Sequence, residues 1–109
     1  MWLNKRAEKV RKIQDYRDEI RDYLPWQELE ASYRITGIIR RLNRLGVSDI
    51  YLIRAYLPGV DLRGTNLQKA ILVKANLRGA VLNVIDFQGA ALAWISTEGD
   101  SPKDLAPQP

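Results

Sequence analysis

The sequence contains no cysteine and no histidine, and only one methionine and one phenylalanine. Without cysteine the chain can form no disulfide and no thiolate metal site. Without histidine it lacks the commonest general base and the commonest ligand of transition metals. The remaining side chains do not combine a nucleophile, a base and an orienting group. We therefore expect no enzymatic activity, no catalytic residue, no cofactor and no bound metal.

Long hydrophobic runs are also missing. No apolar stretch approaches the roughly 20 residues that are needed to span a bilayer. The opening residues, MWLNKRAEKVRK, lack the apolar stretch of a signal peptide. The length of 109 residues predicts one compact unit. These features predict a cytoplasmic protein, and peripheral contact with a membrane is the alternative location.

A period of five residues dominates the second half of the chain. A leucine or phenylalanine recurs at every fifth position, and a small or short residue stands two places before each. The recurring residues are Leu57, Leu62, Leu67, Leu72, Leu77, Leu82, Phe87 and Leu92. Five is the period of neither an isolated helix nor a strand. A fixed period over this length is typical of a solenoid, whose units bury their apolar faces only by stacking.

The units AYLPG, VDLRG, TNLQK, AILVK, ANLRG, AVLNV, IDFQG and AALAW resemble the pentapeptide-repeat family over residues 55–94, and IYLIR adds a unit from Ile50. The resemblance implies a right-handed, four-sided β-helix with one pentapeptide on each side. The central leucine and the small residue before it would point inward. Eight units correspond to about two coils. Tyr56, Ile71, Val81 and Ala91 depart from the family pattern because they replace its usual Asp or Asn.

Two helices are expected before the repeats. Residues 4–24 carry one apolar stripe at helical spacing, and Pro25 ends that helix. Pro25 is also acceptable at the first position of a second helix, which runs to about Leu45 and stops at Gly46. We expect this second helix to cap the first coil through Ile38, Leu42 and Leu45, since solenoids need capped ends.

The predicted fold class is therefore α+β, with two N-terminal helices capping a short right-handed quadrilateral β-helix. We divide the chain into a helical arm at 1–46, a β-helix at 47–95 and a disordered tail at 96–109. The tail is polar and rich in proline. Glycines that recur at repeat spacing are assigned to corners, and the recurring Asp and Asn residues to hydrogen bonds within turns rather than to a cation site.

One side of the predicted β-helix is apolar. With four units in a coil, residue n stacks on residue n+20, and the fourth side places Ile71, Val73 and Lys74 above Ala91, Ala93 and Trp94. Five of these six outward positions are apolar, which is unexpected for a solvated side. Two interpretations are open: the chain covers this side with its first helix or tail, or a partner protein binds it. The interaction candidates are Ile71, Val73, Ala91, Ala93, Trp94 and Ile95.

The C-terminal end offers a second contact. Beyond the last coil the sequence provides only Trp94, Ile95 and the polar tail. In the pentapeptide-repeat family such an end is often closed by a second copy. We therefore predict a homo-oligomer, in the form of a dimer through the C-terminal coil, or a subunit of a larger assembly.

Charge is distributed in blocks within the net +4 of the chain. Residues 31–46 hold four bases and no acid, namely Arg34, Arg40, Arg41 and Arg44. Nucleic acid is disfavoured as their partner because the segment lacks interleaved aromatic residues and a known recognition motif. An acidic block at 13–30 is a competing partner within the chain. The basic stretch that begins at Lys5 favours weak, reversible contact with an anionic lipid surface as an alternative.

These observations predict a non-catalytic protein-interaction module that acts as an adaptor or assembly subunit. It would use a β-helix face and the charged helical arm, and it would self-associate. The alternative function is docking to an anionic surface, lipid or nucleic acid, through the basic helices. The sequence names no partner.

Overall fold

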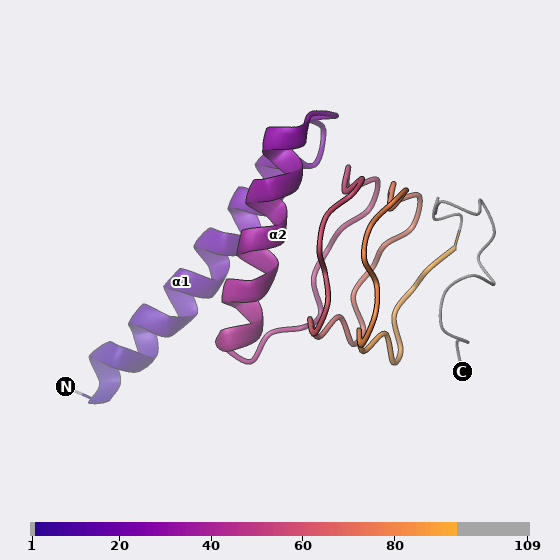
Figure 1. Ribbon diagram of the computed structural model, residues 1–109. Coiled ribbons are helices and arrows are strands. Elements are labelled where there is room, and N and C mark those ends of the chain that lie inside the picture. The colour runs from indigo at the N-terminus through magenta and orange to yellow at the C-terminus, as the bar shows by residue number, and fades with distance from the viewer. Residues whose placement is uncertain (1, 94–109) are drawn as a thin grey trace.

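The computed structural model describes residues 2–93 (Figure 1). Helix α1 spans Trp2–Tyr23, helix α2 spans Leu29–Arg44, and the chain then winds into stacked coils. In Figure 1, α2 lies beside the first coil, and the N-terminal end of α1 projects away from the coils. Trp94, Ile95 and the predicted tail lie outside the described residues.

Helix α1 is amphipathic only in its second half, as the stripe predicted. Ile20 and Leu24 are buried, and Ile13, Tyr16 and Tyr23 are half-buried against the same core. The helix ends before Pro25, because the residue that precedes a proline is pushed out of the helical region. Helix α1 packs against α2.

Helix α2 begins later than the sequence suggested. Pro25 does not open it; the helix starts at Leu29, after Glu28 in an extended conformation with φ −134° and ψ 152°. Between the helices the Trp26 amide donates to the Tyr23 carbonyl at 3.0 Å. The two aromatic rings meet edge to face, with centroids 5.9 Å apart. This turn takes up the residues that the prediction had placed in the helix. The predicted stop at Gly46 is confirmed by its φ of +84°.

The coils stack in the predicted register. Each β-bridge joins residue n to residue n+20 in parallel, from Tyr51 with Ile71 to Ile71 with Ala91. The Ile71 amide donates to the Ile50 carbonyl at 2.9 Å, so the stack begins at Ile50. The bridges stay isolated because only a few residues of each side are extended before the chain turns. These repeats form a β-helix.

Corners recur every five residues and are marked by a positive φ. Glycine occupies the corner at Gly59, Gly64, Gly79 and Gly89, as predicted. The other corners are held by Arg54, Lys69, Lys74 and Val84, with φ between 58° and 63°. The sequence did not reveal these, because residues with a Cβ seldom adopt a left-handed conformation. The periodic turns are thus imposed by stacking as well as by glycine.

The core lies inside the coils and continues into α2. The central leucines from Leu52 to Leu77 are at most 1% exposed. Thr65 is also buried, and its hydroxyl donates to the Leu62 carbonyl at 2.8 Å, so the polar atom is satisfied. Towards the C-terminal end, Leu82 and Leu92 are only half-buried. Burial therefore decreases along the stack.

Candidate functional site

The N-terminal end of the β-helix is closed by α2, as predicted. Ile38, Ile39 and Leu42 are at most 1% exposed and belong to the same hydrophobic cluster as the first coil. Leu45, which we expected to contribute, is half-buried. Apolar contact accounts for the packing, but it does not satisfy the backbone groups along the edge of the first coil.

Three polar side chains of α2 satisfy that edge. The Ser32 hydroxyl donates to the Tyr56 carbonyl at 2.5 Å. The Arg40 guanidinium donates to the Asp61 carbonyl at 2.7 Å and to the Arg63 carbonyl at 3.2 Å. Both acceptors lie on one side of the coil. Each of these bonds pairs a backbone carbonyl of the first coil with a donor of α2, so the helix is a specific cap.

Asn43 is the third of these residues. Its amide oxygen accepts from the Asn66 backbone amide at 2.7 Å, and its Nδ2 donates to the Asn66 carbonyl at 2.8 Å. The side chain thus takes the place of a neighbouring strand. Nδ2 also donates to the Val47 carbonyl at 3.0 Å, which ties the end of α2 to the start of the repeats. Sequence analysis missed Ser32 and Asn43, since neither departs from an ordinary helix sequence.

The predicted basic cluster is divided among different roles. Arg40 caps the coil and is half-buried. Arg34 pairs with Glu30 of its own helix at 3.3 Å, while Arg41 and Arg44 are exposed. Glu19 of α1 lines the same groove as Arg34 and Arg41, which agrees with the expectation that the acidic block faces the basic one. The four arginines therefore do not form one continuous docking patch.

The fourth side is exposed and larger than the sequence indicated. Tyr51 stacks on Ile71, and Ile71 stacks on Ala91. Tyr51 is 46% exposed and Ile71 is 37% exposed. Val73 and Ile53 are half-buried, and Ala91 and Ala93 are exposed. We call residues 51–53, 71–73 and 91–93 the apolar side. Residues 51–53, the first of its three stacked segments, were missed because the sides were counted from residue 55.

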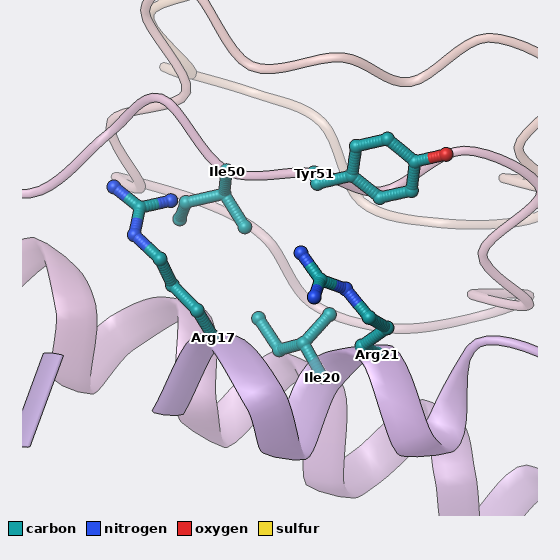
Figure 2. Close-up of a pocket in the computed structure, with 5 residues that line it drawn as sticks. All are labelled: Arg17, Ile20, Arg21, Ile50 and Tyr51. Carbon is teal, nitrogen blue, oxygen red and sulfur yellow. The ribbon is translucent and has the colours of Figure 1, made fainter. Parts of the chain in front are cut away.

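Helix α1 reaches the apolar side only at its N-terminal edge, beside Tyr51. A small pocket there is lined by Arg17, Ile20, Arg21, Ile50 and Tyr51 (Figure 2). Arg17 donates to the Asp49 carbonyl at 2.8 Å and pairs with the Asp49 carboxylate at 3.1 Å. These contacts hold α1 against the first coil but leave Ile71 open. The interpretation that the first helix covers the fourth side is therefore wrong, and coverage by the tail lies outside the described residues.

The C-terminal edge differs from the capped end. In the first coil the amides of Leu57, Leu62 and Leu67 donate to carbonyls of the second coil, at 2.8–3.0 Å. Leu77, Leu82 and Phe87 hold the equivalent positions in the second coil, and within residues 2–93 their backbone amides have no carbonyl of a further coil to donate to. Ile85 and Leu82 are half-buried at this end. Unpaired strand edges favour pairing with another chain.

The recurring Asp and Asn side chains form turns, as predicted. The amide two residues ahead donates to Asp61, Asn66, Asn76 and Asp86 at 3.0–3.1 Å. Arg63 also donates from its guanidinium to the Asp61 carboxylate at 2.8 Å and lowers the pKa of Asp61 to about 2. The Gln88 amide and the Gln68 side chain lower the pKa of Asp86. These carboxylates are occupied by protein donors.

A second exposed apolar cluster lies at the start of α2. Trp26, Leu29 and Tyr33 are 50%, 54% and 66% exposed. Sequence analysis did not single them out: Leu29 and Tyr33 are four residues apart on α2, and Trp26 stands in the turn before it. Trp and Tyr are common in binding hot spots. Tyr33 of this cluster is therefore a control position for variants of the apolar side.

The first part of α1 is basic and open. Every residue from 4 to 12 is exposed, and this stretch holds five bases against Glu8, which gives a net charge of +4. Val10 on this segment is 64% exposed. In the described part of the chain, neither helix is long and apolar enough to cross a membrane.

Comparison with protein families supports the resemblance. Residues 48–83 match the family model described as pentapeptide repeats, in 8 copies. The match includes the unit at Ile50 and ends before the last units predicted from the sequence, although Asp86 and Ala91 keep the same stacking register. No curated protein and no solved structure matches the chain.

Proposed function

Because residues 48–83 belong to the pentapeptide-repeat family, we propose that this chain is a non-catalytic protein-interaction module. It acts as an adaptor or assembly subunit, and its contact surface is the apolar side. The module is a right-handed quadrilateral β-helix of about two coils that is rigidly attached to a helical cap. A rigid, flat surface of this kind binds without paying for the ordering of loops.

The exposure of the apolar side carries the proposal. Ile71 and Tyr51 are more than one-third exposed, although the same chain seals the N-terminal end of its core almost completely. Contiguous exposed apolar residues on a small protein mark interaction sites. The neighbouring column of Ile53 and Val73 is half-buried, which widens the contact surface. A partner would bury both columns.

A capture experiment with matched variants tests this function. The bait proteins are the wild type, Ile71→Glu on the apolar side, Asn83→Glu on another side of the coil and Tyr33→Glu in the second cluster. We expect Ile71→Glu alone to lose a partner that the wild type captures from cells of the source organism. Circular dichroism checks that each variant is folded. Retention of every partner by Ile71→Glu would contradict the proposal, and loss only with Tyr33→Glu would move the site to α2.

Self-association through the C-terminal edge is a second part of the proposal. The partly open core favours the stacking of a second copy, as do the amides of Leu77, Leu82 and Phe87, which find no acceptor within residues 2–93. The variant Ile85→Lys places a charge in this half-buried end, and inward-pointing charges block edge pairing. Sedimentation equilibrium is expected to show a dimer for the wild type and a monomer for Ile85→Lys. A monomeric wild type at high concentration would contradict self-association.

One observation favours docking to an anionic lipid surface as the alternative function. Residues 4–12 are all exposed and carry a net charge of +4. Each base near an anionic membrane contributes about 1 kcal/mol of attraction. Co-sedimentation with anionic vesicles but not with neutral ones would support this function. The variant Lys5→Glu/Lys9→Glu should abolish it and leave the capture experiment unchanged.

A further inference from the structure

Basic residues stand at the corners before and after the apolar side. Lys69 precedes the side at one corner, and Arg54 and Lys74 follow it at the other. The Arg54 amide donates to the Val73 carbonyl at 2.9 Å, so that corner is fixed to the apolar side by the ladder. All three basic side chains are exposed. Three bases therefore border the apolar side, and the one acid that the described residues place at the same border, Asp49, is paired with Arg17.

The three bases occupy positions that suit glycine. Their φ values are 62–63°, in the left-handed region that residues with a Cβ disfavour. The corners remote from the apolar side hold glycine, with the exception of Val84. Backbone strain of this kind concentrates at functional sites. Three strained cations around one surface indicate a preference for a negatively charged ligand.

The side chain of Lys69 shows how such a corner is used. A Cβ built on Gly89 would lie 3.3 Å from Lys69 Cγ, so the stem of Lys69 lies over the Gly89 corner of the next coil. The absence of a side chain at Gly89 leaves room for that stem. The stem of Lys69 is thereby held at the corner that leads into the apolar side, two residues before Ile71.

The chain itself contains a segment of matching chemistry. Residues 94–109 follow Ala93 directly, and Ala93 is the last described residue of the apolar side. Glu98, Asp100 and Asp104 against Lys103 give this segment a net charge of −2, and it also carries Trp94, Ile95 and Leu105. Fully extended, 16 residues can span about 53 Å. Three stacked tiers cover only about 10 Å.

We propose that residues 94–109 bind across the apolar side of their own chain, with their carboxylates at Arg54, Lys69 and Lys74. The apolar side is then open to a partner only when this segment is displaced. The inference rests on the proposed function, because the partner is what displaces the segment. A partner that competes must itself present acidic and apolar groups, since it meets the same three bases.

Thiol labelling measures the coverage directly, because the chain has no native cysteine. One reporter is Ala91→Cys on the apolar side, and its matched control is Asn83→Cys on another side of the coil. Both positions are exposed in the described structure. Each reporter is placed in the full chain, with its own C-terminal segment or with Glu98→Lys, Asp100→Lys and Asp104→Lys. The reagent is uncharged N-ethylmaleimide.

We expect the thiol of the Ala91→Cys reporter to react about tenfold more slowly than the thiol of the Asn83→Cys control, which corresponds to a segment bound roughly nine-tenths of the time. Charge reversal or about 1 M salt should bring the two rates together. The protection of the Ala91→Cys reporter should not change with protein concentration, because the contact is intramolecular. Circular dichroism verifies the fold of each variant.

Two results would overturn the inference. Equal rates at the two reporters that do not respond to charge reversal would show that the segment does not cover the side. Protection that grows with protein concentration would assign the coverage to a second copy. Either result leaves the capture experiment with Ile71→Glu intact as a test of the proposed function. Conversely, the labelling experiment does not require any partner.

Discussion

The two ends of the β-helix are treated differently by the same chain. At the N-terminal end, α2 buries Ile38 and Leu42 and supplies side-chain partners to the backbone edge through Ser32, Arg40 and Asn43. At the C-terminal end, the described residues leave Leu82 half-buried. One end is built as a boundary of the fold, whereas the other retains the groups on which another coil could stack.

The difference shows that a solenoid cap has two separate tasks. Covering leucines removes apolar area from water, which any apolar helix could do. Satisfying the backbone edge requires donors and acceptors at the spacing of the coil, and Asn43 provides both. Cap and repeat are therefore one cooperative unit, and the stability of the chain should be concentrated near α2.

The largest expected effect is the loss of a core leucine next to the cap. Leu62 is 0% exposed, and Leu82 stands in the same column one coil below, half-buried. We expect Leu62→Ala to lower the free energy of unfolding by about 2–5 kcal/mol. The matched variant Leu82→Ala should cost about 1–2 kcal/mol, because less apolar area is lost from the core. Urea denaturation measures both, and equal losses would mean that the C-terminal end is as well covered as the first coil.

The second effect isolates the polar task of the cap. Asn43→Ala removes three hydrogen bonds and leaves the backbone of Asn66 without its side-chain partner. The expected loss is about 1–3 kcal/mol in the free energy of unfolding. Asn83→Ala is the control, because Asn83 is exposed in the lower coil. It should change stability by no more than about 0.5 kcal/mol. If Asn43→Ala behaved like the control, apolar packing alone would explain the cap.

The third comparison concerns one corner in two coils. Gly64 and Val84 occupy the same column, with φ values of 74° and 58°. A Cβ added at Gly64 would meet no atom within 4 Å, so Gly64→Ala tests the backbone alone. Gly64→Ala should lower the free energy of unfolding by about 1–2 kcal/mol, because alanine disfavours a left-handed backbone. Val84→Gly should raise it by about 0.5–1 kcal/mol, since the greater freedom of glycine in the unfolded chain offsets part of the gain. Thermal denaturation distinguishes these signs, and a destabilising Val84→Gly would show that the exposed valine makes contacts of its own.

Much of the fold was predictable because a pentapeptide period dictates stacking. The spacing of the leucines from Leu57 gave the period of five, and the family resemblance, which implies four units in a coil, predicted the register of 20 residues and the inward positions. The cap contacts were not predictable, since Asn43 looks like any polar helical residue until the edge of the first coil is placed against it. Tyr51 was missed for a similar reason: it belongs to the apolar side only because Ile50 already begins the stack. The bases at Arg54 and Lys74 have no local sign of a left-handed backbone.

The smallest effect compares two turn carboxylates as the pH falls. The folded pKa of Asp61 is lowered to about 2 from an ordinary value of 3.8, so its ionised form stabilises the fold above about pH 4. That contribution is lost as the pH falls from about 4 towards 2, because the carboxyl group is then protonated in the folded state as well as in the unfolded state. Asp86 has a lowered pKa and the same sign, but its donors are the neutral Gln88 amide and Gln68 side chain rather than a guanidinium. Asp61→Asn should therefore unfold at a lower urea concentration than the wild type at pH 6. This difference in urea midpoint should disappear as the pH approaches 2, and it should be smaller in about 1 M salt. For Asp86→Asn we expect a difference in urea midpoint that responds little to salt. For either variant, a difference that stays constant across this pH range would exclude ionisation of the carboxylate as the cause.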